Sequence, residues 1–289
     1  MMNLRSGLAQ MHRRLLSSLH SQPVSLGNTG PFVSFCFDDF PRTAYAIGGA
    51  VLKNFDARGT YYVAMGLMNT CNGLGDQFTG EDLDCLLAEG HELASHTFSH
   101  VSCRTVSSLA FEDDVWRGRD AIRHATGYDP GNFAYPYGHV TLAAKKRVGG
   151  QMRSCRSICS GLNGPTVDLN LLRANSVYGG VGHFGELESL LSRNEKVKGW
   201  LILYTHDVRP DPSPFGCTPA LFERVVARAA SGGARIAPVR DVIAAARPVL
   251  SESFSSDSNI DDIKVGSNRS YVATPDRVPL RRGVCHEQN

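Results

Sequence analysis

The sequence predicts an α/β fold: a (β/α) barrel, distorted or incomplete, with about seven strands and an N-terminal helix. Short apolar runs alternate with amphipathic stretches along residues 31–248. Strands separated by helices in this way form βαβ units and a mainly parallel sheet. An open doubly wound sheet is the alternative, but neither GxGxxG nor GxxxxGK[ST] follows the first apolar run. The alternative therefore lacks its main sequence support, a nucleotide-binding motif.

The expected elements follow one another along the middle of the chain. Strands are predicted where β-branched and aromatic residues form short runs, at residues 33–37, 60–64, 92–95, 132–135, 199–204 and 235–237. Helices are predicted from amphipathic spacing at residues 45–56, 83–89, 107–126, 185–193, 221–231 and 239–246. Thr79 is the expected N-cap of the second helix, because Glu81 and Asp82 follow it in the first turn.

Composition indicates a globular protein with enough apolar material for a sizeable core. The chain has 289 residues, of which 42% are hydrophobic and 20% charged, and its formal net charge is +2. A charge so close to zero gives no electrostatic footprint for nucleic acid, so no nucleic-acid partner is expected. No apolar run approaches the roughly 18–20 residues that span a bilayer, so no transmembrane segment is expected.

Both ends differ from the alternating middle, which is the expected catalytic domain of residues 31–248. Residues 1–30 are expected to form a helical extension, packed on the domain or bound to a membrane surface or a partner. Apolar residues recur there at helical spacing, at Leu4, Leu8, Met11, Leu15 and Leu19. This segment lacks the apolar core of a secretory signal, so a cytoplasmic location is expected. Residues 249–289 are rich in Ser, Asp, Arg and Asn and are expected to form a polar, disordered tail.

Two charged or titratable motifs directly follow predicted strands, where the loops of a barrel gather on one face. Asp38 and Asp39 follow the first strand. One of two such carboxylates can bind a cation while the other stays free to take a proton. His96 and His100 follow the third strand. On a helical turn, residues four apart face the same way, so both imidazoles can hold one metal ion.

Two further motifs occupy equivalent positions. Tyr135 and Tyr137 belong to FAYPYG, an aromatic turn that can form one wall of a groove and leave the N–H of Tyr137 pointing inward. His206 follows the strand at residues 199–204 and is well placed as a general acid. Each of the four motifs, taken alone, would also suit a loop, a helix cap or the core.

Together the motifs indicate hydrolysis of an amide. One aspartate and two histidines form an open three-ligand site that leaves a position for water. A bound divalent cation lowers the pKa of water from 15.7 to about 7. The second aspartate can then deprotonate the water, and His206 can protonate the leaving nitrogen.

The motifs FDDFP, EGHELASHTFSH, FAYPYG and LILYTHD, in this order, resemble those of NodB-like polysaccharide deacetylases, which form carbohydrate esterase family 4. The resemblance covers about residues 33–246 and implies a TIM-barrel-like hydrolase that removes N-acetyl groups from acetamido sugars. An N-acetylated carbohydrate, polymeric or oligomeric, is the implied substrate. The implied cofactor is a divalent metal ion, usually Zn²⁺, with Co²⁺ or a similar ion as an alternative.

The resemblance also implies a role for each motif residue. Asp38 would be the catalytic base and His206 the general acid. The implied metal ligands are Asp39, His96 and His100. The backbone N–H of Tyr137 would stabilise the oxyanion, an electrostatic task that is central to acyl transfer. Tyr135, Tyr137 and Leu203 would contact the substrate, with Leu203 against the acetyl methyl.

The sequence departs from the family pattern at two positions. Phe40 stands where the family usually has Gly, and Ala134 where it usually has the Arg that orients the base. The Tyr-Pro-Tyr variant of the third motif resembles the branch that acts on poly-N-acetylglucosamine. There an Arg from the next segment can do this work, and Arg173 is the candidate in this chain.

Two other functions stay open on the sequence. The same site could hydrolyse another C–N bond, by deformylating a lipid-linked amino sugar or opening a small cyclic amide. A non-catalytic carbohydrate-binding protein is the third hypothesis, in which the aromatic turn is a platform for sugar rings. The catalytic hypotheses require Asp38, whereas the binding hypothesis does not.

Overall fold

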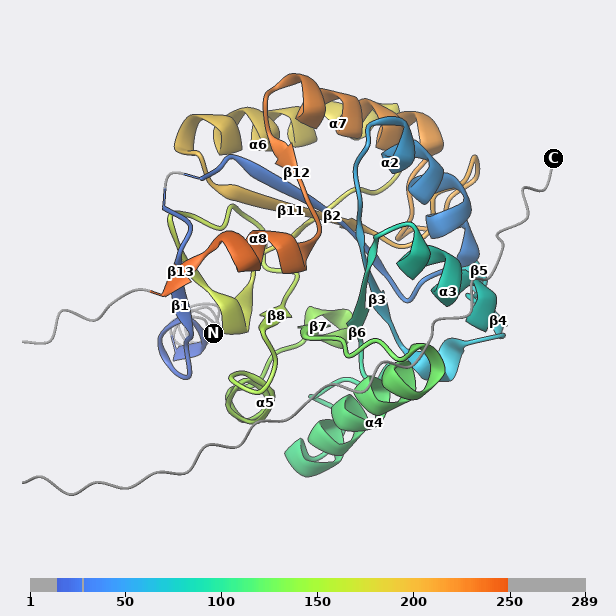
Figure 1. Ribbon diagram of the computed structural model, residues 1–289, viewed down its shortest axis with the longest axis vertical. Coiled ribbons are helices and arrows are strands. Elements are labelled where there is room, and N and C mark those ends of the chain that lie inside the picture. Colours follow the sequence, from blue (N-terminus) through green and yellow to red (C-terminus); the bar gives the residue numbers. More distant parts are fainter. Residues whose placement is uncertain (1–14, 28, 249–289) are drawn as a thin grey trace, which may run out of the picture. The chain divides into compact units, whose positions relative to one another are not determined.

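A computed structural model describes residues 15–27 and 29–248 of the chain (Figure 1). The tail predicted at residues 249–289 lies outside this part, and so does most of the helix predicted within residues 1–30. Residues 15–18 of that segment are helical, and Leu16 is buried. Among the described residues, no helix is long and apolar enough to cross a membrane.

The fold is an incomplete parallel (β/α) barrel, as the sequence predicts. Seven strands pair in the order β10-β11-β2-β3-β6-β7-β8, and β12 adds an eighth beside β2. Every pair in this sheet is parallel. The strands are β2 Phe32–Asp38, β3 Thr60–Val63, β6 Glu92–Ser95, β7 Asn132–Ala134, β8 Ser154–Arg156, β10 Asn175–Ser176, β11 Trp200–Thr205 and β12 Arg235–Ile236. Because β8 and β10 are the two ends of the order, the barrel stays open between them.

Helices surround the sheet (Figure 1). They are α2 Ala50–Asn54, α3 Gly80–Ala88, α4 Ser108–Thr126, α5 Leu142–Val148, α6 Phe184–Val197, α7 Pro219–Ser231 and α8 Val239–Ala245. Thr79 caps α3 as predicted, since its side chain accepts from the N–H of Asp82 while the Asp82 carboxylate accepts from the N–H of Thr79. The helix predicted at residues 45–56 differs, because Ala44–Gly49 is wound as a π-helix before the short α2 begins.

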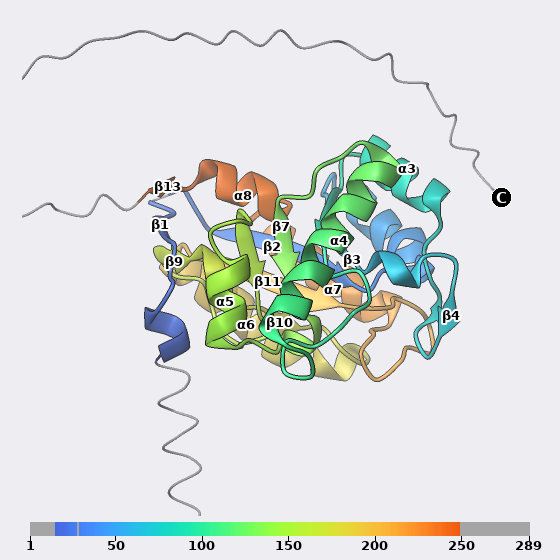
Figure 2. The same cartoon turned by 90° about the horizontal axis from the view of Figure 1, so that it is seen from below.

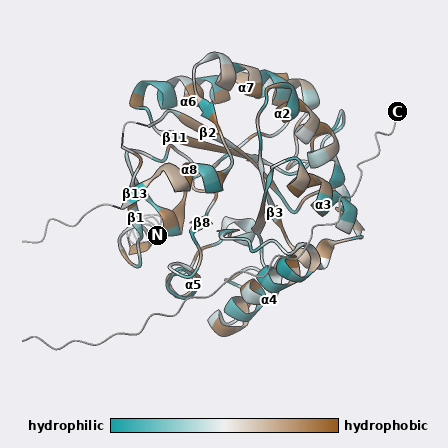
Figure 3. Cartoon of the chain, in the orientation of Figure 1, coloured by the Kyte–Doolittle hydropathy of each residue, from teal (hydrophilic) through white to brown (hydrophobic). Residues whose placement is uncertain are grey.

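The core follows the alternation of side chains along the strands. On β11, Leu201 and Leu203 pack in the cluster that includes residues of α6 and α7, such as Leu187 and Phe222. The next residue along, Tyr204, belongs with Ile202 to a second cluster, inside the barrel. Figure 3 shows the apolar strands at the centre and polar residues on the helices around them.

α8, which follows β12, covers the end of the sheet where the strands begin (Figure 2). The N–H of Val239 donates to the side chain of Thr60, the first residue of β3. Glu92, at the start of β6, is fully buried and accepts hydrogen bonds from Thr60, Asn132 and the N–H of Arg240. This network leaves the opposite end of the sheet, where the strands finish, free to carry a site.

A small antiparallel sheet joins distant parts of the chain. In it, β1 (Pro23–Ser25) pairs on one side with β9 (Thr166–Asp168) and on the other with β13 (Arg247–Pro248). The ammonium group of Lys145, whose side chain is buried, donates to Asp168 and to the carbonyl of Leu16 beside it. The described ends of the chain are therefore held together.

The sequence pattern predicts no element between residues 136 and 184, where the structure has α5, β8, β9 and β10. The three strands have only two or three residues each and contain polar side chains. Such short segments show no apolar alternation, so neither a strand nor a helix period emerges. The hairpin of β4 (Cys71–Asn72) and β5 (Gly75–Asp76) was missed for the same reason.

Candidate metal and catalytic site

The two aspartates occupy the end of the central strand. Asp38 is the last residue of β2, and Asp39 begins the loop in a left-handed conformation with φ of 63°. Both side chains are largely buried. The change in backbone direction between them turns the two carboxylates to different partners, which gives them different chemistry.

His96 and His100 converge from an irregular loop after β6. The prediction that they share a face of a helical turn is wrong, because Thr97 and His100 both have positive φ, 63° and 54°. The loop still brings the imidazoles together, with ring centroids 4.9 Å apart. The two imidazoles are therefore close together, as predicted, but the backbone between them is an irregular loop rather than a helical turn.

Asp39, His96 and His100 form a cluster that fits a metal ion. One donor atom from each lies within 4.8 Å of the others. Oδ1 of Asp39 is 3.6 Å from Nε2 of His96 and 3.1 Å from Nε2 of His100. Nδ1 of His96 lies 2.8 Å from the carbonyl oxygen of Ala134, so donation from Nδ1 leaves Nε2 free as a ligand. Oδ1 of Asp39 is buried without a well-directed hydrogen-bond donor, as expected of an atom that binds a cation.

The electrostatics of the cluster keep His96 and Asp39 in the forms that bind a metal. Burial, and to a smaller extent the nearby His100, lower the pKa of His96 to about 4. The imidazole is therefore neutral at physiological pH. Burial alone would raise the pKa of Asp39, but the adjacent imidazoles of His100 and His96 lower it to about 2.

Arg156 is the arginine that faces Asp38. Its Nη2 donates to Oδ1 of Asp38 at 2.5 Å, and both side chains are buried. The guanidinium lies near the rings of Tyr62 and Tyr204, 4.7 and 5.0 Å from their centroids. Burial would lower the pKa of Arg156, but the charge of Asp38 raises it, so the arginine stays charged.

The sequence-based choice of Arg173 for this role is wrong. Arg156 is directly opposite Ala134 in the pairing of β7 and β8, so the next strand supplies the arginine that Ala134 cannot. Arg173 donates instead to the carbonyl oxygen of Ser160, and it does not line the cavity that contains Asp38. The error follows from missing β8, because no predicted strand placed Arg156 at the site.

A cavity of about 560 Å³ contains the aspartates and the predicted histidines. His206 lies on its wall, with Nδ1 3.1 Å from the carbonyl oxygen of Phe215. Tyr137 is exposed, has φ of 58°, and its ring lies 4.6 Å from that of His100. Residues that sequence reasoning missed complete the lining: Asn72, Gly73, Leu74, Gly138, Ile158, Tyr178, Tyr204, Ser213, Pro214 and Phe215. Gly138 and Tyr204 belong to the motifs FAYPYG and LILYTHD, but neither was predicted to line the site. The other residues come from segments without acid, base or ligand spacing, so no motif could reveal them.

Two predicted substrate contacts lie elsewhere. Tyr135 is 1% exposed and packs in the core beside Phe111 and Phe133. Leu203 is fully buried on the helix-facing side of β11, so its neighbour Tyr204 lines the cavity instead. Leu203 was misplaced because adjacent residues of a strand face opposite sides. Tyr135 follows the end of β7, where its side chain turns into the core.

Phe40 does not narrow the cavity. It is fully buried on the far side of the loop, where its ring stacks on Phe78 with centroids 5.2 Å apart. Its φ of 66° lies in the left-handed region that glycine adopts most readily. This position therefore keeps a glycine-like backbone with an aromatic side chain.

Sequence comparisons identify relatives of this chain. Residues 26–150 match a family model described as polysaccharide deacetylase. The chain is 25% identical over 138 residues to the peptidoglycan-N-acetylglucosamine deacetylase PgdA of Listeria monocytogenes serotype 1/2a. This match covers 47% of the chain and 28% of PgdA. The chain therefore matches less than a third of the length of that relative.

Structural comparison supports the barrel. A candidate polysaccharide deacetylase from Mycobacterium smegmatis superimposes with a TM-score of 0.53 at 14% identity, covering 73% of this chain and 88% of that one. The peptidoglycan deacetylase PdaC of Bacillus subtilis gives a TM-score of 0.48 at 16% identity, covering 75% and 92%. At 14% identity, the similarity to the Mycobacterium smegmatis protein concerns the fold alone.

Proposed function

We propose that this chain is a metal-dependent hydrolase that removes N-acetyl groups from acetamido sugars. The match of residues 26–150 to the polysaccharide deacetylase family model supports this proposal. The observation that carries the proposal is the arrangement at the end of β2. Asp39 clusters with two histidines, while Asp38, next to it, is paired with Arg156 in the same cavity. One aspartate is thus available to a cation and the other to a proton.

Zn²⁺ is the proposed metal. Two imidazole nitrogens and one carboxylate oxygen are a donor set that zinc uses in catalytic sites with an open position. Co²⁺ suits similar ligands and is the alternative. When bound, such an ion polarises a carbonyl group and acidifies water.

The chain's own residues would divide the proton transfers. Asp38, held by Arg156, would take the proton of the water that attacks the acetyl carbonyl carbon. The backbone N–H of Tyr137 would donate to the carbonyl oxygen as it becomes negatively charged. His206, with Nδ1 toward the carbonyl of Phe215, would give a proton to the sugar nitrogen as the C–N bond breaks. Acetate and a free amine are the products.

The strand that supplies Arg156 bears on which branch of the family this chain resembles. Arg156 comes from the strand after Ala134 rather than from the third motif itself. This arrangement supports the resemblance to the Tyr-Pro-Tyr branch that acts on poly-N-acetylglucosamine. We therefore choose neutral oligosaccharides of N-acetylglucosamine as the first substrates to test.

The proposal is tested by metal content and by acetate release from chito-oligosaccharides, with and without added Zn²⁺ or Co²⁺. We expect His96→Ala to lose both metal and activity, because it removes one of three ligands. Asp38→Asn should keep the metal and lose at least about 100-fold in rate, the usual scale of general base catalysis. The matched control is His124→Ala, which removes an exposed histidine on α4.

Each contrary result has a distinct meaning. Bound metal without acetate, but with formate or a ring-opened product from other amides, would support the alternative C–N hydrolases. Metal-independent sugar binding that Asp38→Asn leaves unchanged would support the carbohydrate-binding hypothesis. A protein that binds neither metal nor sugar would contradict the proposed function.

A further inference from the structure

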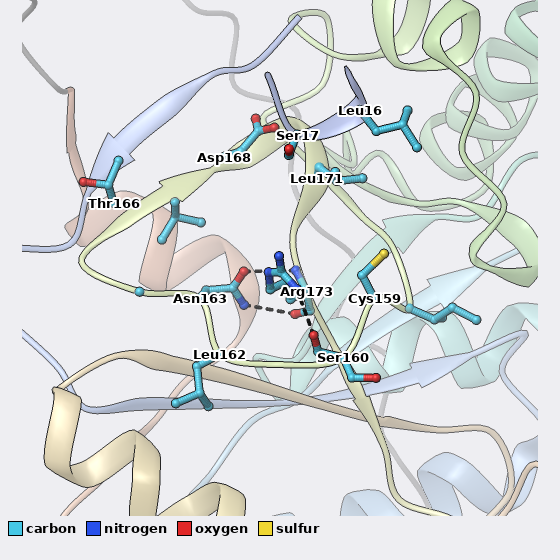
Figure 4. Close-up of a pocket in the computed structure, with 13 residues that line it drawn as sticks. Leu16, Ser17, Cys159, Ser160, Leu162, Asn163, Thr166, Asp168, Leu171 and Arg173 are labelled. Carbon is cyan, nitrogen blue, oxygen red and sulfur yellow. Dashed lines mark hydrogen bonds between the residues drawn. The ribbon is translucent and has the colours of Figure 1, made fainter. Parts of the chain in front are cut away.

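A second cavity, of about 750 Å³, shares Ile158 with the metal cavity. Figure 4 shows the residues that line this second cavity. Its walls come mainly from the segment between β8 and β10, with Leu16 and Ser17 on another side. Ile158 lines both cavities and is 41% exposed. A ligand chain that leaves the metal site past Ile158 would therefore enter this second cavity.

Arg173 supplies the positive charge of the second cavity, and Figure 4 shows its guanidinium in the middle of the lining residues. Asn163 fixes its backbone, because the amide accepts from the N–H of Arg173 and donates to its carbonyl. One guanidinium nitrogen, Nη1, donates to the carbonyl of Ser160 at 2.9 Å. Within the described part of the chain, no carboxylate lies within 4.0 Å of this guanidinium. Donors of the guanidinium therefore remain for a ligand.

The carboxylate in the same cavity does not neutralise Arg173. Asp168 is bound by Lys145, whose Nζ lies 2.6 Å away and whose side chain is fully buried. The backbone N–H groups of Gln22 and Asn170 also donate to Asp168. Since this carboxylate already has its own cation, the cavity keeps the positive charge of Arg173.

The rest of the lining suits a sugar. The hydroxyl-bearing residues Ser160 and Thr166 alternate with the apolar side chains of Leu162 and Leu171. A planar guanidinium binds carboxylate and phosphate groups through two parallel hydrogen bonds, which a hydroxyl group of a neutral sugar cannot match. The cavity thus combines a sugar-like lining with one anion-binding group.

Another cavity also adjoins the metal cavity. A third cavity, of about 370 Å³, shares Tyr178 and Pro214 with it. The metal cavity therefore adjoins two further cavities, which give a ligand longer than a small cyclic amide room to extend.

We propose that the cavity around Arg173 binds an anionic group, a carboxylate or a phosphate, on a sugar next to the acetamido sugar that reacts. This inference rests on the proposed function and makes it more specific: the preferred substrate is an acidic N-acetylated glycan. Arg173 is then a specificity-determining residue that touches the substrate away from the reacting atoms.

The test measures binding separately from hydrolysis. Calorimetric titrations use the metal-loaded Asp38→Asn protein, so that no ligand is consumed. The ligands are a chito-oligosaccharide, an oligosaccharide of equal length that alternates N-acetylglucosamine with glucuronate, and a chito-oligosaccharide carrying a 6-phosphate. We expect at least one acidic ligand to bind about tenfold more tightly than the neutral one, the scale of a charge-assisted hydrogen bond. Tighter binding of the glucuronate ligand alone would indicate a carboxylate site, and tighter binding of the 6-phosphate ligand alone would indicate a phosphate site.

Adding Arg173→Gln should remove this preference while leaving binding of the neutral ligand unchanged. The matched control is Arg193→Gln, which removes an exposed arginine on α6 and should keep the preference. Equal affinity for neutral and acidic ligands, or an equal loss for both on Arg173→Gln, would overturn the proposal. Because binding is the readout, an enzyme that releases no acetate would contradict the proposed function and leave this result standing.

Discussion

Two neighbouring aspartates have different partners, which suits them to different proposed roles. Asp39 faces imidazoles, whereas Asp38 is held by a buried guanidinium. An ion pair such as that of Asp38 and Arg156 is worth little to stability when intact, but removing one partner leaves an uncompensated buried charge. The pair therefore fixes the position of the proposed base more than it stabilises the fold.

Replacing Arg156 tests this positioning role. We expect Arg156→Gln to lower the rate of acetate release by about 10- to 100-fold, the usual effect of removing a group that orients a reacting one. It should also lower the free energy of unfolding by about 3–5 kcal/mol, since Asp38 loses its counterion. Steady-state kinetics and urea denaturation measure the two effects.

Conservative and control variants keep this prediction interpretable. Arg156→Lys retains the charge and should recover most of the stability but less of the rate, because the two-pronged geometry is lost. Arg153→Gln, an exposed arginine just before β8, should change neither quantity. A wild-type rate in Arg156→Gln would remove Arg156 from the proposed mechanism.

Some residues of the candidate site could be predicted from the sequence, and others could not. The candidate ligands and both proposed proton-transfer groups do meet in one cavity, because each directly follows a strand and parallel strands end on one face. Arg156, Tyr204 and Phe215 could not be found in this way, since their positions depend on strand pairing and on loop paths. Tyr135 and Leu203 were misplaced because a motif does not tell which face of its strand is buried.

At the scale of elements, α4 is fitted closely against the histidine loop. A Cβ atom built on Gly118 would lie 2.6 Å from the backbone carbon and oxygen of Thr97. Thr97 lies between the two candidate histidine ligands. Glycine in a helix is unfavourable by roughly 1 kcal/mol relative to alanine, so this glycine is explained by the close contact.

Gly118→Ala should therefore destabilise the protein despite its better helix propensity. We expect a loss of about 1–3 kcal/mol in the free energy of unfolding, the usual effect of overpacking, and weaker metal binding. Gly185→Ala in α6 is the matched control, since nothing lies within 4 Å of the added Cβ. That variant should be neutral or slightly stabilised. Urea denaturation and zinc titration of both variants measure these effects. A Gly118→Ala protein as stable as Gly185→Ala would contradict the prediction.

Long elements were predictable and short ones were not. α4 and α7, with 19 and 13 residues, have clear amphipathic periods and glycines at their ends. β8, β9 and β10 depend on partners distant in sequence, such as β1 for β9. Local patterns contain no information on such pairing, so the barrel class was predictable whereas its opening between β8 and β10 was not.

At the scale of the whole molecule, metal binding should stabilise the fold. The candidate ligands come from loops after two different strands, β2 and β6, so a bound ion would link them. A free metal concentration 100 times Kd adds about 2.7 kcal/mol. For a domain of this size that corresponds to roughly 5–10 °C in Tm.

Thermal unfolding with and without Zn²⁺ checks this expectation. A chelator should reverse the shift, and His96→Ala should show little or none. The same small shift in wild type and His96→Ala would indicate ion binding elsewhere on the surface. This readout needs no substrate, so it judges the metal site independently of the reaction.

The pairing of β1 with β13 has a consequence for how the barrel can be combined with other proteins. Val24 is opposite Pro248, and Ser25 is opposite Arg247. β1 and β13 lie near the two ends of the described chain and are paired side by side. The barrel is therefore suited to insertion as a unit into a surface loop of a host protein. For the same reason, a short peptide joining these two strands would allow the chain to be cut open elsewhere, giving circularly permuted forms of the same barrel.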